Sequence, residues 1–370
     1  MYKVKYVDLA IKDTILKEEI LDSVNTILTS GQFILGEVVK RFEENIARYL
    51  GVRYAIGVNS GTDALSLCLR AFGIGDGDEV ITTSNSFLAT ASAIIETNAK
   101  PVFVDISDDL NIDPELIEEK ITTKTKAIMP VHLSGKPAKM NEILKVARKY
   151  NLKVIEDAAQ SIGTEYFSKK TGSIGDVGCF SMHPLKTLNA CGDAGLITTN
   201  DKELYLKLKQ FRNLGLKNRN ESDVWGYNSR LDAIQAAVLD IKLKYIDSWI
   251  EKRRQNAKFY IDNLKDTLIV PKEEEYEKHS FHTFVIQTEN RDVFQKHLEE
   301  NKVETKIHYP IPIHKQKAAS YLNYTDNALP KTCLAAKRIL SLPIYQDLTD
   351  VQLEYVIEKI QSFFPQPIEI

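Results

Sequence analysis

The sequence predicts an α/β protein in which a large domain precedes a smaller α+β domain. Over the first 245 residues, short β-branched runs alternate with helical patterns, which indicates a mostly parallel, seven-stranded sheet with helices on both faces. The pattern changes near Tyr245, where a long charged helix begins and strands become sparse. We therefore expect a large domain with N-terminal helices at residues 1–245 and a small domain at residues 246–370.

The elements expected in each domain follow from hydrophobic periodicity. Seven strands are expected in the large domain, at residues 55–58, 79–83, 101–105, 127–131, 153–157, 178–181 and 196–199. Helical patterns lie between several of them, at residues 62–72, 87–97 and 138–150. In the small domain we expect strands at 281–287 and 303–308, and helices at 246–263, 291–301, 328–339 and 349–363. The acidic stretch at 272–277 is expected to be a solvated surface loop.

The composition argues against several classes of protein. The 370 residues include 48 basic and 51 acidic side chains, so a net charge of −3 gives no basic field for nucleic acid. The seven histidines are scattered, and neither an HExxH nor a CxxC pattern occurs, so no metal site is predicted. Four widely spaced cysteines suggest free thiols in a reducing cytoplasm: Cys68, Cys179, Cys191 and Cys333. The N-terminus lacks the apolar stretch of a signal peptide, and no run of about 18 apolar residues occurs, so we expect a soluble cytoplasmic protein without a membrane partner.

Lys186 is the most informative residue, because it lies in a nearly uncharged loop 29 residues after Asp157. Pyridoxal 5′-phosphate requires an amine that condenses with its aldehyde and a carboxylate that keeps its ring nitrogen protonated. Lysine suits the first role because burial lowers its pKa, whereas arginine does not deprotonate. A lone lysine in a loop usually faces solvent, so the prediction of a cofactor site depends on Lys186 and Asp157 together.

Asp157 ends the strand predicted at residues 153–157, at the edge where open α/β sheets bind ligands. There its carboxylate can form a charge-assisted hydrogen bond with a pyridinium nitrogen. The alternative is that Asp157 caps the turn or helix that follows.

Residues 59–65 offer donors for a phosphate group. They join the first predicted strand to a helix, where backbone N–H groups, Gly61 and the hydroxyls of Ser60 and Thr62 form an anion cradle. The same residues are also typical of an N-cap with an acidic first turn. The Walker pattern GxxxxGK[ST] is absent, and Ser181 offers one more hydroxyl.

These segments, with others along the chain, resemble the sugar aminotransferases of the DegT/DnrJ/EryC1/StrS family, within the fold type I pyridoxal-phosphate enzymes. The resemblance runs nearly from end to end. The matching stretches are residues 30–36, 42–43, 59–64, 102–105, 131–135, 156–160, 172–176, 180–186, 192–195, 226–233 and 308–310. The resemblance implies the fold of that class and a homodimer with active sites at the subunit interface.

The resemblance also implies roles around the cofactor ring. Lys186 would form the imine with the aldehyde, Asp157 would pair with the pyridine nitrogen, and Gln160 would contact the phenolic oxygen. Phe87 falls where the family places an aromatic residue against the ring face, although ordinary core packing at a helix start is the alternative.

The resemblance places four residues at the cofactor phosphate. Gly61, Thr62 and Ser181 would hold it within one subunit, and Asn228 would reach it from the partner subunit.

Five residues are candidates for substrate contact: His183, Arg230, His308, Tyr309 and His314. Residues 308–314 form a proline-rich loop that, in the family, approaches the substrate, although a structural proline turn is the alternative. Arg230 either meets an anionic substrate group or forms a structural ion pair. His183 stands where many members carry another residue, so it is expected near the site or is simply a loop histidine.

The reaction implied by the resemblance is a ping-pong transamination. L-Glutamate would donate its amine, Lys186 would move the proton and leave pyridoxamine phosphate, and a ketone would then receive the amine. The family points to a nucleotide-linked keto-deoxysugar and to polysaccharide biosynthesis, and a small phosphorylated ketone is the alternative acceptor. A dehydratase, which in this family carries histidine in place of the lysine, is disfavoured by Lys186. A catalytically idle regulatory protein is the remaining alternative.

Overall fold

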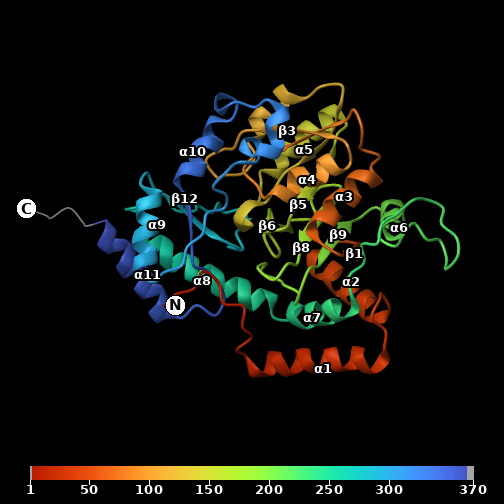
Figure 1. The fold of residues 1–370 in the computed structure, drawn as a ribbon, viewed down its shortest axis with the longest axis horizontal. Helices are drawn as coiled ribbons and strands as arrows, with labels where there is room; N and C mark the ends of the chain where they lie inside the picture. The colour runs from red at the N-terminus through yellow and green to blue at the C-terminus, as the bar shows by residue number, and fades with distance from the viewer. Residues whose placement is uncertain (1, 365–370) are drawn as a thin grey trace, which may run out of the picture.

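A seven-stranded sheet forms the centre of the large domain (Figure 1). The computed structural model describes residues 2–364. The strands are β1 Tyr54–Val58, β2 Glu79–Thr83, β3 Lys100–Val104, β4 Thr125–Met129, β5 Lys153–Asp157, β8 Val177–Ser181 and β9 Gly195–Thr199. Their order is β1-β9-β8-β5-β4-β2-β3, and only β9 runs antiparallel to its neighbours. The prediction of a mostly parallel sheet is confirmed, and each predicted strand boundary lies within two residues of the observed one.

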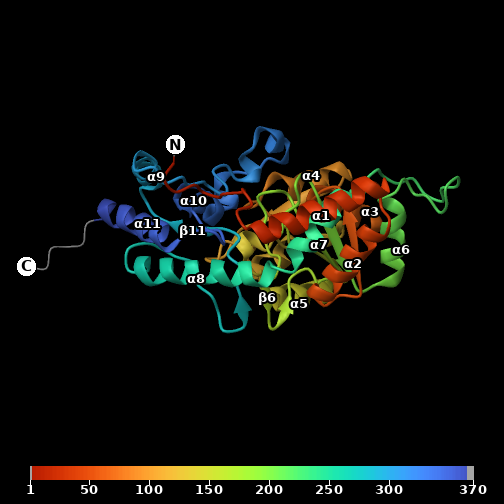
Figure 2. The same ribbon diagram turned by 90° about the horizontal axis from the view of Figure 1, so that it is seen from below.

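Helices cover both faces of this sheet because its strands are apolar on both sides. One face packs against α2 Glu37–Leu50, α5 Met140–Tyr150 and α7 Ala233–Leu243. The other packs against α3 Gly61–Ala71, α4 Leu88–Glu96 and α6 Lys202–Phe211. Helix α1 Thr14–Ser30 lies outside these layers and packs on α7, as Figures 1 and 2 show.

The small domain begins with α8 Ile246–Leu264, which runs away from α7 toward α11 (Figure 2) and contributes Ala257, Tyr260 and Leu264 to the core of that domain. It contains α9 Arg291–Glu300, α10 Pro330–Arg338, α11 Asp350–Phe363 and an antiparallel pair of strands, β11 Phe284–Gln287 and β12 Ile339–Leu342. The strand predicted at residues 303–308 is wrong. That segment makes only isolated bridges, Val303 with Val4 and Lys306 with Ser341, because the buried run of β12 takes the place beside β11.

Two segments cross between the domains. Val4 pairs with Val303 and is fully buried in the small-domain core, so the N-terminal segment packs on the C-terminal half of the chain. Ile313 packs on Phe103 of β3, so part of the C-terminal half contacts the large domain. The predicted division after residue 245 coincides with the start of α8.

The remaining elements are short. Three two-residue strands form a small sheet, β6 Glu165–Tyr166, β7 Lys169–Lys170 and β10 Glu277–Lys278. The 3-10 helices are η1 Pro114–Leu116, η2 Glu118–Lys120, η3 Leu133–Gly135, η4 Ile313–Lys315, η5 Lys317–Leu322 and η6 Asp326–Ala328. The acidic stretch at 272–277 is exposed up to its last residue, where β10 begins.

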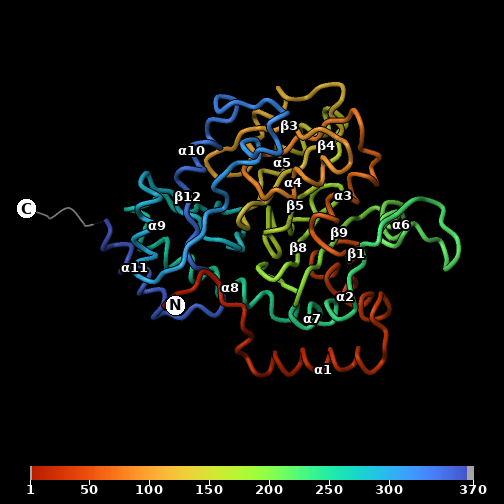
Figure 3. Tube along the Cα trace, viewed as in Figure 1, coloured from red at the N-terminus to blue at the C-terminus, as the bar shows by residue number. Residues whose placement is uncertain are grey.

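The chain between α6 and α7 leaves the body of the molecule as a long loop (Figure 3). Trp225 in this loop is 95% exposed, which is unusual for a large aromatic side chain. Among residues 2–364, no helix combines the length and apolar character needed to cross a membrane.

Candidate active site

A cavity of about 310 Å³ lies at the carboxyl ends of β5 and β8. This is the edge of the sheet at which open α/β folds bind ligands. The cavity brings together most of the predicted site residues, namely Gly61, Thr62, Phe87, Asp157, Gln160, Ser181, His183, Lys186, His308 and Tyr309.

The Lys186 amine projects into this cavity from a short loop after β8. Its backbone N–H donates to the carbonyl of His183 at 2.8 Å, and its carbonyl accepts from the Asn189 side chain at 2.9 Å, which fixes the loop. Burial lowers the pKa of Lys186 to about 8, because the charged form is desolvated, although the Asp157 carboxylate partly offsets this. Roughly one amine in ten is therefore neutral at pH 7, as a nucleophile and proton carrier requires.

Asp157 ends β5 with its carboxylate facing the same cavity. It accepts from the Thr90 hydroxyl at 2.8 Å and from the backbone N–H of Ala159 at 3.2 Å. Burial raises the pKa of Asp157, and no cation of residues 2–364 lies within 4.0 Å of it. A protonated ring nitrogen would supply the missing positive charge. Because it accepts from the backbone N–H of Ala159, Asp157 also caps the turn that follows β5, as the alternative interpretation predicted.

Glu156, beside Asp157, has a structural role. It is fully buried, and its two carboxylate oxygens accept from the backbone N–H groups of Gly172, Ile174 and Gly175 at 2.6 to 2.8 Å. The His132 ring lies 2.9 Å from the same carboxylate. These contacts fix the end of β5 and so hold Asp157 in place.

The start of α3 lies on another wall of the cavity, where it could hold an anion. Ser60 caps the helix by accepting from the backbone N–H of Asp63 at 3.1 Å, and the N–H groups of Gly61 and Thr62 remain at the helix start. A Cβ atom on Gly61 would lie 2.7 Å from the Cβ of Ser181, so only glycine allows this approach to the end of β8. The same residues can therefore cap the helix and also bind an anion.

Gln160, Tyr309 and Phe87 lie around the same space. The Gln160 side chain accepts from the backbone N–H of Ser134 at 2.7 Å and donates to the Tyr309 hydroxyl at 3.0 Å. The rings of Phe87 and Tyr309 are 5.7 Å apart. Phe87 is 54% exposed and lines the cavity, so it is not a core residue.

Two histidines lie at the cavity wall. His308 Nδ1 is 2.9 Å from the Ser341 hydroxyl, and burial with the charges of Lys186 and Lys306 lowers the pKa of His308 to about 4. This imidazole is therefore neutral at pH 7. His183 is exposed, and its Nδ1 accepts from the backbone N–H of Leu185 at 3.2 Å.

Two predicted residues lie outside the cavity on the segment before α7. Asn228 is exposed and bridges to Asn213. Arg230 donates to Asn213 Oδ1 at 3.2 Å. No carboxylate of residues 2–364 lies within 4.0 Å of Arg230, so the structural ion pair that was its alternative does not form within the described chain.

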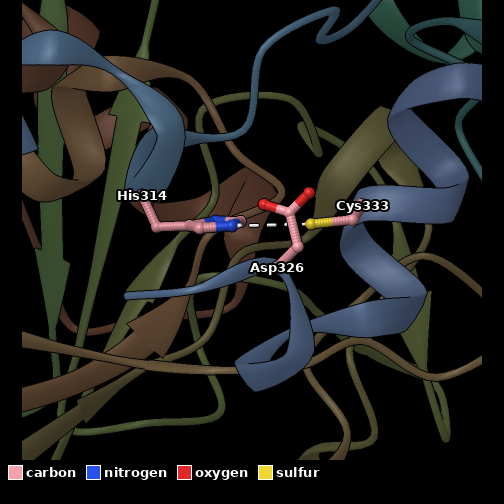
Figure 4. Close-up of side chains that lie close together, drawn as sticks. All are labelled: His314, Asp326 and Cys333. Carbon is pink, nitrogen blue, oxygen red and sulfur yellow. Dashed lines mark hydrogen bonds between the residues drawn. The ribbon is translucent and has the colours of Figure 1, made fainter. Parts of the chain in front are cut away.

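His314 also lies outside the cavity, and we do not assign it to substrate binding. It is buried with Nδ1 2.7 Å from the Ser84 hydroxyl and Nε2 3.6 Å from the Cys333 sulfur. Figure 4 shows His314 facing Cys333 beside Asp326, and possible ligand atoms of the three lie within 4.8 Å of one another. The sequence predicts no such grouping. Asp326 already pairs with Lys315 at 2.8 Å.

Several cavity residues were not predicted from the sequence, among them Tyr6, Thr90, Arg253, His282 and Thr283. The sequence pattern of α8 marks one of these residues, Arg253, as unusual. Residues 246, 250, 253, 257, 260 and 264 share the helical spacing of a buried face, and Arg253 is the charged member of that row. The other four carry no pattern that marks them.

The fold and the cavity together define a class of protein. A lysine amine, a buried carboxylate and an anion cradle meet at one sheet edge, and these groups fit the aldehyde, ring nitrogen and phosphate of pyridoxal phosphate. The chain is a pyridoxal-phosphate-dependent aminotransferase of fold type I. Residues 14–361 match the DegT/DnrJ/EryC1/StrS aminotransferase family, and the chain belongs to that family.

Curated relatives and solved structures extend over nearly the whole chain. A pleiotropic regulatory protein of Geobacillus stearothermophilus is 44% identical over 94% of this chain and 95% of its own. A dTDP-3-amino-3,6-dideoxy-alpha-D-galactopyranose transaminase of Aneurinibacillus thermoaerophilus is 43% identical over 94% of this chain and 96% of its own. The structure of S. venezuelae DesV in complex with a ketimine intermediate superposes with a TM-score of 0.96, at 36% identity, over 99% of this chain and 100% of that one.

Proposed function

We propose that this protein transfers an amino group from L-glutamate to the ketone of a nucleotide-linked keto-deoxysugar by a ping-pong reaction. One observation carries the proposal: the amine of Lys186 and the buried carboxylate of Asp157 line a single cavity with the phosphate cradle at the start of α3. Bound pyridoxal phosphate supplies an electron sink for the negative charge that develops when a proton leaves the donor carbon.

The residues of the cavity would bind and orient the cofactor and transfer the proton. Lys186 Nζ would hold the cofactor and, once released, carry the proton, because its pKa of about 8 allows it to act in both forms near neutral pH. Asp157 would keep the ring nitrogen protonated, and Gln160 and Tyr309 would orient the ring's oxygen side through their shared hydrogen bond. The neutral imidazole of His308 adds a hydrogen-bonding group at the wall without adding charge.

The acceptor is proposed from the relatives. The transaminase of Aneurinibacillus thermoaerophilus is named for an amino group at C3 of a dTDP-linked dideoxygalactose, so a nucleotide-linked sugar with a C3 ketone is the first acceptor to test. A small phosphorylated ketone is the second acceptor to test, because the chemistry at Lys186 is the same for any ketone that carries an anionic group.

We also propose that the protein acts as a homodimer. The chain between α6 and α7 projects from the body as a long loop (Figure 3), and Asn228, which bridges to Asn213 at the base of this loop, is exposed. The family resemblance assigns Asn228 to the partner's phosphate site.

The test is a pair of half-reactions. Protein loaded with pyridoxal phosphate is mixed with L-glutamate, and release of 2-oxoglutarate is measured in the absence of an acceptor. One equivalent per site indicates a ping-pong reaction. After glutamate is removed, keto-sugar nucleotides and phosphorylated ketones are screened for return of the yellow aldehyde form.

The matched control is Lys186→Ala, which should bind the cofactor noncovalently and release no 2-oxoglutarate. Turnover by this variant would move the acid–base role to another residue. A wild-type protein that binds the cofactor but never releases 2-oxoglutarate would contradict L-glutamate as the amino donor.

A further inference from the structure

His314, Asp326 and Cys333 form a cluster of metal-ligating side chains away from the active-site cavity (Figure 4). His314 lies on η4, Asp326 begins η6, and Cys333 lies in the first turn of α10, so the cluster joins three elements of one segment. One potential ligand atom from each residue lies within 4.8 Å of the other two. Within residues 2–364, no other group of three such side chains meets this condition.

The Ser84 hydroxyl orients the His314 ring. It lies 2.7 Å from Nδ1 and also accepts from the backbone N–H of His314 at 3.0 Å, so one hydroxyl fixes both the ring and its backbone. When Nδ1–H donates to Ser84, the lone pair of Nε2 faces the Cys333 sulfur (Figure 4). Histidine ligands of metal ions usually donate their second ring N–H to a protein group in this way.

The spacing of this nitrogen and sulfur matches a tetrahedral zinc site. His314 Nε2 and Cys333 Sγ are 3.6 Å apart. With a Zn–N bond of about 2.0 Å, a Zn–S bond of about 2.3 Å and a tetrahedral angle between them, two such ligands lie about 3.5 Å apart. An S–H···N hydrogen bond is the alternative explanation of this distance, so the third side chain of the cluster is needed to distinguish the two.

Asp326 provides the third ligand and a negative charge. Its Oδ2 pairs with Lys315 at 2.8 Å, which leaves Oδ1 for a metal ion. A thiolate and a carboxylate would balance the two positive charges of a zinc ion, as a partly buried site requires. Imidazole, thiolate and carboxylate groups are all zinc ligands, whereas calcium and magnesium prefer oxygen alone.

We propose that His314 Nε2, Asp326 Oδ1 and Cys333 Sγ bind one zinc ion, with water in the fourth position. The Cys333 thiol releases its proton to solvent as the ion binds, because zinc binds the thiolate. The inference is independent of the proposed reaction, since none of the three residues lines the active-site cavity.

The zinc ion would have a structural role. Its ligands span residues 314–333, and both ends of this segment adjoin contacts with the large domain. At one end Ile313 packs on Phe103, and at the other Asp105 accepts from the backbone N–H of Thr332 at 2.8 Å. An ion that joins the two ends would stabilise the contact of this segment with the large domain.

The experiment measures zinc and cobalt binding by the full-length, untagged protein loaded with pyridoxal phosphate. Bound metal is first removed with a chelator, and zinc affinity is then measured by competition with a chromogenic chelator. Cobalt difference spectra identify the ligands, because the visible bands report tetrahedral geometry and a near-ultraviolet band reports a thiolate. The variants are Cys333→Ser, Asp326→Asn and Lys315→Gln. The matched control is Cys191→Ser, which removes an exposed free cysteine outside the cluster.

We expect the wild-type protein to bind one zinc ion per chain. Cys333→Ser should weaken zinc binding by at least about a hundredfold, since loss of an outer-shell partner alone costs about 10- to 100-fold. Asp326→Asn should weaken it roughly tenfold, because the amide keeps an oxygen ligand without the charge. Lys315→Gln should tighten binding several-fold, because it removes a competing positive charge. Cys191→Ser should bind zinc as the wild-type protein does.

Three outcomes would overturn the zinc site: no stoichiometric zinc binding by the wild-type protein, unchanged affinity in Cys333→Ser, or a cobalt complex without the thiolate band. The contact between His314 and Cys333 would then be a hydrogen bond. Unchanged affinity in Asp326→Asn would overturn the three-ligand arrangement. Because zinc stoichiometry and the cobalt spectrum are measured on the wild-type protein, they decide the question even where a variant does not fold.

Discussion

Replacing Lys186 with methionine tests whether the fold maintains a desolvated amine at a cost in stability. Methionine has a similar length and no charge, so it suits the half-buried position. A fall in the lysine pKa from 10.5 to about 8 corresponds to an unfavourable contribution of roughly 3 kcal/mol to the free energy of unfolding of the cofactor-free protein. Lys186→Met should be more stable than wild type at pH 7 by up to that amount.

The sign of the pH dependence follows from proton binding. Below about pH 8 both the folded and the unfolded chain hold the Lys186 proton, so the full penalty is present. Between pH 8 and 10.5 the folded protein has released the proton while the unfolded chain still binds it, so wild-type stability rises with pH. The advantage of Lys186→Met should therefore fall from about 3 kcal/mol at pH 7 to about 1 kcal/mol at pH 10.

The assay is urea unfolding of the cofactor-free proteins at one fixed protein concentration, at pH 7 and pH 10. The control is Lys258→Met, which removes a lysine that is 76% exposed and paired only with Asp262 on the same helix, and which should show little pH-dependent difference. A variant that is no more stable than wild type at pH 7, or whose advantage does not change with pH, would refute the reasoning.

Two further predictions concern the phosphate site. Gly61→Ala should weaken cofactor binding roughly tenfold, measured by absorbance titration, because its Cβ would meet the Ser181 side chain; Gly192→Ala, whose nearest neighbour is the flexible end of a glutamine side chain, should bind normally. If Asn228 acts in the partner's site, mixing and refolding the inactive variants Lys186→Ala and Asn228→Ala should restore about one quarter of wild-type activity, through heterodimers with one intact site. No recovery, with dimers confirmed by light scattering, would place Asn228 outside the partner's site.

Much of the site could be predicted because a parallel sheet places consecutive strand ends at one edge. Asp157 and Ser181 end β5 and β8, and the helix that starts at Gly61 follows β1, so residues far apart in sequence line one cavity. Each motif was ambiguous alone. Their positions after predicted strands, taken together with the family resemblance, predicted that they lie in one site.

The features that the sequence analysis missed depend on contacts between residues far apart in the chain, which local sequence patterns do not predict. Residues 303–308 alternate like a strand, yet β12 takes the position beside β11. Tyr6 reaches the cavity only because the N-terminal segment crosses to the small domain. His314 shares a proline-rich loop with Tyr309, but Ser84 holds it in the interior. Arg253 is charged although its spacing on α8 places it in a row of buried side chains, and the sequence analysis did not use this mismatch.

Borohydride reduction followed by peptide mapping tests the central claim most directly. The protein is loaded with pyridoxal phosphate, reduced, digested and analysed by mass spectrometry. The cavity geometry predicts one stable phosphopyridoxyl group per chain, on the peptide that contains Lys186. A label on a different lysine, or none on a fully loaded protein, would contradict the assignment of this cavity as the active site.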